Sequence, residues 1–143
     1  MNAAYLYAQL EECDKINRKR HQVYDGYHER WKIWKNRERF ERPVVPEGCV
    51  HNAHMYYIKV KDIAVRTRLI AYLRENGIAP AFHYVPLHSS PAGEKFGRFH
   101  GKDVYTTKES ERLLRLPMFY DLSMDDVIIL RKRSESLSFD GGR

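Results

Sequence analysis

The chain has 143 residues, of which 43% are hydrophobic and 13% aromatic, a composition typical of one folded domain with a modest core. It contains no run of about 18 apolar residues, so the sequence argues against a membrane span. The net charge of +6 raises the question of nucleic-acid or phosphate ligands, but the basic residues are scattered and no nucleic-acid-binding motif accompanies them. We therefore expect neither a membrane nor a nucleic acid as a partner.

The N-terminus and the cysteines indicate the compartment. The first residues lack the basic and apolar regions of a signal peptide, and the two cysteines, Cys13 and Cys49, form no CxxC pair. Disulfides are rare where no export signal is present. We therefore expect reduced thiols in a cytoplasmic protein.

Residues 2 to about 35 are expected to form one long helix, because apolar side chains recur at steps of three and four residues and no proline occurs before Pro43. Arg20 interrupts this apolar stripe, and Gly26 weakens the helix by about 1 kcal/mol relative to alanine. Such a helix is roughly 50 Å long, which exceeds the diameter of about 30 Å expected for a compact domain of this size. Part of it is predicted to pack on something outside this chain, and a kinked helix that stays within the domain is the alternative. The stripe consists of Leu6, Leu10, Cys13, Ile16, Val23, Tyr27, Trp31 and Trp34.

The middle of the chain alternates between strand and helix patterns. Residues 50–60 alternate between a more apolar and a more polar face, which predicts a strand. Helical spacing follows over residues 61–76, with Asp62 as the N-cap and Gly77 as part of a left-handed C-terminal cap. Residues 78–82 then begin a second strand.

The C-terminal part predicts two more helices and a third strand. Residues 106–109 match a capping box and open a short helix that extends through Leu114. Pro117 ends that helix and leaves residues 116–119 as a candidate strand at a sheet edge. A second capping signal, at residues 123–126, opens a last apolar helix.

The order of these elements predicts an α/β fold, a small three-stranded sheet covered by helices and preceded by a long N-terminal helix. The apolar pattern stops after Leu130, and residues 131–143 are polar and end in glycines and arginine. We therefore expect one domain over residues 1–130 and a disordered tail over residues 131–143.

A loop with two imidazoles and a phenol follows the second predicted strand. His83, Tyr84 and His88 are grouped around Pro86, which stiffens the backbone between them. Histidine and tyrosine suit acid–base work or hydrogen bonding to a phosphate or sugar. The alternative is a rigid loop whose rings only pack over the sheet edge. The residues alone do not decide between a ligand-binding loop and a structural one.

Metal and thiol chemistry have weaker support. The chain has seven histidines, but His51 and His54 point to opposite faces if both lie in a strand, and no HExxH or paired-cysteine motif is present. Cys13 lies on the apolar face of the first helix, where an inert thiol is the commoner case. We therefore expect no metal site and no catalytic cysteine.

Four segments of the chain resemble the C-terminal part of the DegT/StrS sugar aminotransferases. The resemblance covers roughly residues 2–130, and it implies the small C-terminal domain of a pyridoxal-phosphate enzyme with the aspartate-aminotransferase fold. After Leu130 the family continues an amphipathic helix, whereas this chain turns polar. The four segments are NAAYLYAQLE (2–11), NAHMYYIKV (52–60), FHYVPLHSSPAGEKFG (82–97) and YTTKESERLLRLPMFYDLS (105–123).

The resemblance also implies a reaction. Enzymes of this family transfer an amino group from L-glutamate to the C4 keto group of a dTDP-4-keto-6-deoxyhexose, and they work as homodimers. In the family, the region that binds the cofactor and carries its lysine precedes the region matched here. The resemblance therefore implies no catalytic and no cofactor-binding residue on this chain, which by itself would be inactive.

The same resemblance places substrate-binding candidates. His83, Tyr84 and His88 are expected near the nucleotide-sugar entrance, and Asn52 and His54 are further candidates of the same kind. The alternative is a stand-alone module that uses this loop to bind a nucleotide sugar or another phosphate without catalysis.

Overall fold

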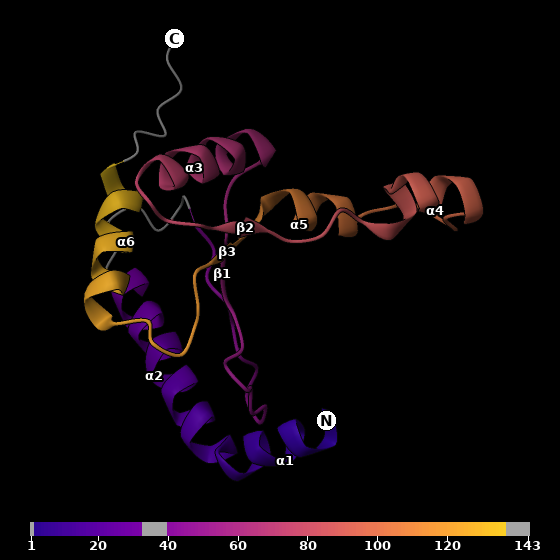
Figure 1. Cartoon of the computed structure of the whole chain (residues 1–143). Helices are drawn as coiled ribbons and strands as arrows, with labels where there is room; N and C mark the ends of the chain where they lie inside the picture. The colour runs from indigo at the N-terminus through magenta and orange to yellow at the C-terminus, as the bar shows by residue number, and fades with distance from the viewer. Residues whose placement is uncertain (1, 33–39, 137–143) are drawn as a thin grey trace.

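A three-stranded antiparallel sheet lies at the centre of the fold (Figure 1). The computed structural model describes residues 2–32 and 40–136. The strands are β1 (Tyr56–Lys59), β2 (Ala81–Phe82) and β3 (Leu113–Leu116), in the spatial order β1-β3-β2. The predicted α/β fold with a small three-stranded sheet and helices is therefore confirmed.

One face of this sheet is buried. Tyr56 pairs with Leu116 and Ile58 pairs with Leu114, and all four side chains are at most 4% exposed. Their neighbours along the strands point the other way and are half-buried, as the two-residue period of a strand requires. The inner face of the sheet therefore carries the core.

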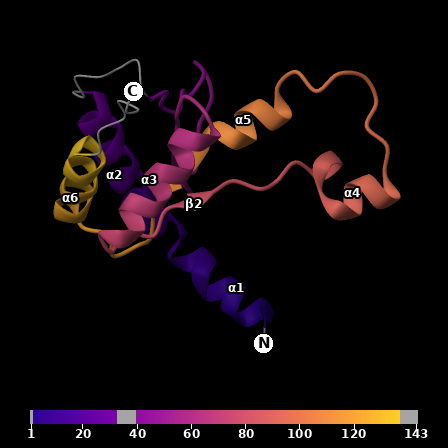
Figure 2. The same ribbon diagram turned by 90° about the horizontal axis from the view of Figure 1, so that it is seen from above.

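Three helices build the core with this face: α2 (Cys13–Lys32), α3 (Ile63–Glu75) and α6 (Met124–Ser136). Helices α2 and α6 lie side by side in both views (Figures 1 and 2). A β-carbon on Gly26 would lie 2.6 Å from the Met124 sulfur, so the glycine allows the two helices to approach closely. The buried apolar side chains of these helices are Val23, Tyr24, Tyr27, Trp31, Leu69, Leu73, Val127 and Leu130.

The predicted caps of α3 and α6 are confirmed. The Asp62 carboxylate accepts a 2.8 Å hydrogen bond from the Val65 amide, and Gly77 adopts φ +75° just beyond the helix. Ser123 and Asp126 form a reciprocal capping box in which each side chain accepts a 3.1 Å hydrogen bond from the other residue's amide.

The prediction for the third strand is wrong in its bounds and in its place in the sheet. Helix α5 (Thr106–Arg112) ends earlier than expected, and β3 runs over residues 113–116 in the middle of the sheet, not over 116–119 at its edge. Leu114 and Leu116 are both buried against the core. Pro117 follows the strand, so its lack of a backbone N–H removes no hydrogen bond between the strands. Two apolar side chains at a spacing of two residues therefore define this strand.

The N-terminal helix is not continuous. Helix α1 (Asn2–Glu11) and α2 are separated at Glu12, where the chain contains neither proline nor glycine. No residue of α1 is buried, and its apolar side chains face solvent, among them Leu6 and Leu10. The prediction of a single long helix is therefore wrong at Glu12. Trp34, the last residue of the predicted apolar stripe, lies outside the described residues. Packing of this helix on something outside the chain stays a prediction.

The expected disordered tail is wrong for Arg131–Ser136, because α6 continues through these residues. Ser134 is fully buried, and its hydroxyl donates a 2.9 Å hydrogen bond to the Leu130 carbonyl one turn earlier. This bond satisfies the hydroxyl inside the core, so a polar residue can continue the buried face. Residues 137–143 lie outside the described residues.

An arm between β2 and α5 projects from the body of the fold in both views (Figures 1 and 2). It contains a 3₁₀ turn, η2 (Leu87–Ser89), and α4 (Pro91–Phe96), a helix that we did not predict. Ser90 caps α4 by accepting a 3.0 Å hydrogen bond from the Gly93 amide, and Pro91 occupies the first helical position.

Candidate functional site

The structure distributes the five predicted site residues over two regions. His83, Tyr84 and His88 lie on the arm between β2 and α4, whereas Asn52 and His54 lie in the loop before β1. His88 and His54 line different pockets. The candidate residues therefore do not form one cluster within this chain.

His83 and Tyr84 follow β2 directly, and His83 is half-buried whereas Tyr84 is exposed. Their ring centroids are 5.0 Å apart in an edge-on arrangement, and the Tyr84 side chain is 73% exposed. The Tyr84 carbonyl accepts a 2.7 Å hydrogen bond from the Ser110 hydroxyl, which ties the loop to α5. The His83 Nδ1 atom is buried and has no hydrogen-bond partner among the described residues. The backbone is thus anchored while the Tyr84 phenol remains available to a ligand.

His88 is held by a carboxylate. Its Nε2 atom lies 2.9 Å from Asp103 Oδ2, and its ring centroid lies 4.4 Å from that of Phe99. Asp103 also accepts hydrogen bonds from the Thr106 and Thr107 amides, so it caps α5 in place of the predicted capping box. The Thr107 hydroxyl, and to a lesser extent His88, hold the pKa of Asp103 below its usual value.

This partnership fixes the chemistry of the His88 ring. An ionised carboxylate accepts hydrogen bonds only, so the proton lies on Nε2 and the Nδ1 atom of the neutral ring is left as an acceptor. The imidazole therefore has a defined orientation and can offer Nδ1 to a donor such as a sugar hydroxyl.

A pocket of about 570 Å³ adjoins His88 on the arm. Its size is that of a small-molecule site, and it combines aromatic rings with basic side chains, which suits a ligand with a planar ring and a negative charge. Its lining includes Leu87, His88, Phe96, Arg98, Phe99 and His100.

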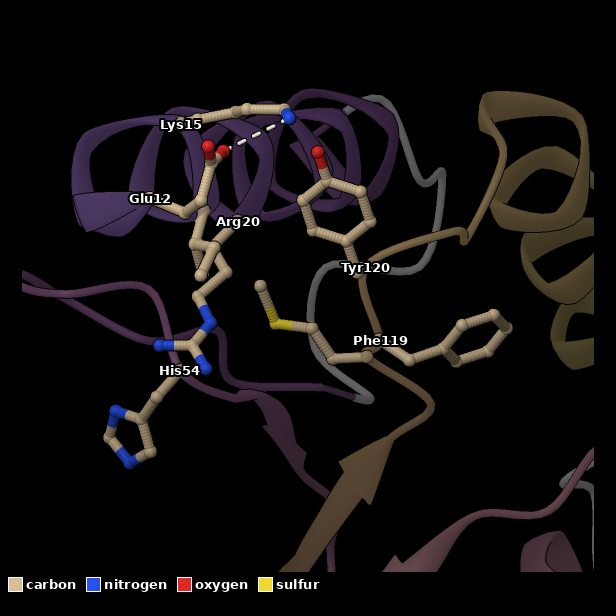
Figure 3. A pocket seen from close by; sticks show the side chains of 8 residues that line it. Glu12, Lys15, Arg20, His54, Phe119 and Tyr120 are labelled. Atoms are coloured by element: carbon tan, nitrogen blue, oxygen red, sulfur yellow. Dashed lines mark ion pairs between the residues drawn. The ribbon is translucent and has the colours of Figure 1, made fainter. Parts of the chain in front are cut away.

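A second pocket of about 470 Å³ lies between the α1–α2 junction, the loop before β1 and the segment after β3 (Figure 3). We call it the junction pocket. Asn52 Oδ1 lies 2.7 Å from Nδ1 of His54, which lines the pocket. Figure 3 shows the Arg20 guanidinium on the same side as His54, and the Phe119 ring directed away from both. Its lining residues are Glu12, Lys15, Ile16, Arg20, His54, Met118, Phe119 and Tyr120.

Two residues of these sites, Asp103 and Arg20, were missed as site residues, although each leaves a signal in the sequence. Asp103 stands three residues before Thr106, a spacing at which an aspartate side chain can accept a hydrogen bond from a backbone amide at the start of a helix. Arg20 is the one charge that interrupts the apolar stripe of the N-terminal segment. A charged residue in an apolar stripe is commonly a solvated side chain, so the position of Arg20 in the sequence is not enough to predict a binding site.

A lysine amine that binds pyridoxal phosphate covalently must lose its proton to react, and two lysines of this chain lie beside carboxylates that oppose this. Lys15 lines the junction pocket, but its ammonium lies 3.0 Å from Glu12, and this hydrogen bond raises its pKa. Lys59 lies 2.6 Å from Glu109, and that hydrogen bond also raises its pKa. Neither lysine fits the role.

Residues 2–32 and 40–136 contain neither a candidate metal cluster nor a candidate membrane span. This part of the chain contains no group of three or more histidine, cysteine, aspartate or glutamate side chains that could hold a metal ion. None of its helices combines the length and the apolar character needed to cross a membrane.

Comparison with known proteins decides the family. Residues 1–131 match the DegT/DnrJ/EryC1/StrS aminotransferase family. The chain belongs to this family. An uncharacterized protein of Methanocaldococcus jannaschii, MJ1066, is 27% identical over 124 residues, which cover 84% of this chain and 31% of that protein.

Solved structures of family members have the same fold. A DegT DnrJ EryC1 StrS aminotransferase from Brucella abortus is 25% identical with a TM-score of 0.77, and the match covers 93% of this chain and 34% of that one. DesV from S. venezuelae is 21% identical with a TM-score of 0.81, covering 95% and 36%. The chain thus spans about a third of the length of the relatives it matches.

Proposed function

We propose that the chain forms the C-terminal small domain of a pyridoxal-phosphate-dependent nucleotide-sugar aminotransferase. The observation that carries the proposal is the family match over residues 1–131, together with the shared fold of aminotransferases. The proposed reaction moves an amino group from L-glutamate to the C4 keto group of a dTDP-4-keto-6-deoxyhexose. The carbanion chemistry belongs to the cofactor, and the protein binds and orients the sugar.

The substrate-binding residues proposed on this chain are His83, Tyr84 and His88, with Asn52 and His54 in a secondary role. Tyr84 offers an exposed phenol, and His88 offers Nδ1 because Asp103 occupies Nε2. Hydrogen bonds of this kind orient a sugar without adding charge to the site.

The proposal extends to a specific enzyme. The HYVPLH and TTKESERLLRLP segments resemble dTDP-4-amino-4,6-dideoxygalactose transaminase, the enzyme of enterobacterial common antigen synthesis. The protein would then be cytoplasmic and would act as a homodimer. Pyridoxal phosphate and its lysine would be supplied outside this chain, because in the family the region that binds the cofactor precedes the region that this chain matches. Lys15 and Lys59 are paired with Glu12 and Glu109, which agrees with that proposal.

A chimera tests the function. This chain replaces the corresponding third of a characterised DegT/StrS aminotransferase, and formation of the dTDP-4-amino sugar from L-glutamate is measured. We expect turnover in the chimera and a loss of about tenfold or more in the His88→Ala variant. Lys102→Ala, an exposed change on the same arm, serves as the control. A folded chimera without turnover on any dTDP-4-keto-6-deoxyhexose contradicts the proposal.

The isolated chain provides the second test. Mixed with pyridoxal phosphate, it is expected to show no absorbance band of a lysine-bound cofactor and no transamination. A lysine-dependent band with turnover contradicts this expectation. Tight binding of dTDP to the isolated chain favours the stand-alone binding module instead.

A further inference from the structure

We infer that the junction pocket binds the anionic oxo group of a ligand, a carboxylate or a phosphate, through Arg20 and His54. The inference assigns a role to Arg20, which the proposed function leaves unused. It rests on the proposed function for the choice of probe molecules and for the secondary substrate-binding role of Asn52 and His54. Binding to this chain can be measured without the cofactor and without turnover.

Arg20 is a cation without a protein counter-ion. Among the residues that the structure describes, no carboxylate pairs with it, and the same holds for Arg18 on the same helix. Arg20 differs from Arg18 in that it lines the junction pocket. Its guanidinium lines the junction pocket and lies on the same side as His54 (Figure 3). The planar fork of an arginine matches the two oxygens of a carboxylate or phosphate, so an uncommitted fork in a pocket is suited to an anion.

His54 lies on the same side of the junction pocket as the Arg20 guanidinium, and Asn52 orients its ring (Figure 3). Asn52 Oδ1 lies 2.7 Å from His54 Nδ1 and accepts its hydrogen bond. In the neutral ring Nε2 is then an acceptor, so His54 contributes to an anion site in its protonated form, in which Nε2–H donates to the ligand. Ala53, between the two, has φ +48° and is the one non-glycine residue in the described ranges with a positive φ. This conformation costs about 1 kcal/mol or more in a residue with a β-carbon. The buried Ala53 methyl (2% exposed) holds the turn that brings Asn52 and His54 together.

The remaining walls define the rest of the ligand. Ile16, Met118 and the ring of Tyr120 are largely apolar and line the same pocket. The Glu12 carboxylate is neutralised by Lys15 at 3.0 Å, so the far end of the pocket does not repel an anion strongly. A volume of about 470 Å³ holds a small organic molecule. The ligand class is therefore an organic carboxylate or phosphate whose uncharged part lies against the Met118 and Tyr120 side.

Two substrates of the proposed reaction carry such a group, namely the amino donor and the nucleotide sugar. The test titrates ¹⁵N-labelled chain at low ionic strength with inorganic phosphate, dTDP and L-glutamate, and follows amide and arginine Nε signals by NMR. We expect at least one probe to shift residues around the junction pocket. Preference for phosphate and dTDP assigns the pocket to the nucleotide, and preference for L-glutamate assigns it to the amino donor.

A matched pair of variants tests the role of Arg20. Arg20→Gln removes the fork, and a lost charge-assisted hydrogen-bond pair is expected to weaken binding about tenfold. Arg18→Gln removes the same charge from the same helix, but Arg18 lines a different surface depression. We expect less than a twofold change there. Arg20→Lys, which keeps the charge and loses the fork, is expected to be intermediate.

Three outcomes overturn the inference. One is that none of the three probes shifts the pocket residues. Another is that Arg18→Gln and Arg20→Gln weaken binding equally, which reveals attraction by the net charge alone. The third is that binding shifts signals on the arm around His88 and leaves those around His54 in place. Circular dichroism of each variant confirms the fold, and these results are independent of turnover in the chimera.

Discussion

The Tyr27 hydroxyl donates a 2.6 Å hydrogen bond to the Pro117 carbonyl, and this bond joins α2 to the segment that leaves the central strand. Tyr27 is fully buried, and its ring stacks on that of Tyr56 at 5.0 Å. Burial raises the pKa of Tyr27 well above its usual value, so the phenol stays a donor at any physiological pH. Because Met118 follows Pro117 directly and Tyr120 lies two residues further along, the same bond fixes one wall of the junction pocket relative to α2.

Tyr27→Phe is therefore expected to destabilise the protein. The variant keeps the ring and removes one satisfied buried hydrogen bond, which costs about 1 kcal/mol and leaves the Pro117 carbonyl without its partner. Tyr56→Phe is the matched control, because the Tyr56 hydroxyl is buried without a hydrogen-bond partner in the described part of the chain. Removing the Tyr56 hydroxyl is expected to be neutral or stabilising. Urea unfolding measures the free energy of unfolding of the two variants. Equal losses of stability in Tyr27→Phe and Tyr56→Phe contradict a stabilising role for the hydrogen bond between Tyr27 and Pro117.

The elements that the sequence predicts well are those with local signals. Asp62 and Ser123 cap their helices as predicted, because the bonds they make reach only three residues along the chain. The alternation of Tyr56, Ile58 and Val60 correctly identifies a buried strand face. The type of a long, periodic or capped segment is determined by residues close to it in the sequence, so it can be predicted without knowledge of the fold.

The errors concern contacts between distant segments. The central place of β3 depends on Leu114 pairing with Ile58 and Phe82, more than thirty residues away along the chain. The sequence also does not show that His54 and His88 line different pockets, because their positions depend on the fold, and their predicted roles in substrate binding stay predictions. Helix α4 is a different case: Ser90 followed by Pro91 is a start signal that was available in the sequence and was overlooked.

Gly93→Ala is expected to distort the arm and leave the core intact. A β-carbon at Gly93 would lie 1.7 Å from the Leu87 carbonyl oxygen, a backbone atom that cannot move without unwinding η2. The resulting shift displaces His88, which lies inside η2. Chemical shifts in an HSQC spectrum are expected to change over residues 83–107 and to stay close to wild type in α2 and α6. Ala92→Gly, one residue earlier and exposed, is the control and should perturb only α4.

Glu109 is expected to contribute to the pH dependence of stability. Its carboxylate lies 2.6 Å from Lys59 and 3.1 Å from Arg112, and the Lys59 hydrogen bond is the largest cause that lowers its pKa. A carboxyl group with a lowered pKa in the folded state stabilises that state above its unfolded pKa of about 4.3, and this contribution is lost as the pH falls through the folded pKa.

Glu109→Gln should therefore be less stable than wild type at pH 7, and the difference should shrink as the pH is lowered below about 4. Urea unfolding at several pH values measures this, with Glu94→Gln, an exposed change on α4, as the control. A constant difference across the pH range would show that the ion pairs around Lys59 make no contribution through ionisation.

Asp103→Asn separates the two tasks of Asp103. Asparagine is also a good N-cap, so α5 should persist, but a neutral amide binds the His88 ring less strongly than a carboxylate does. In wild type, the proton of the neutral ring is expected on Nε2, and the variant should show a mixture of both tautomers in the ¹⁵N shifts of the ring. Asp121→Asn, an exposed change away from the arm, should leave the ring as in wild type. A wild-type tautomer pattern in Asp103→Asn means that packing against Phe99, at 4.4 Å, orients His88 without the help of the charge.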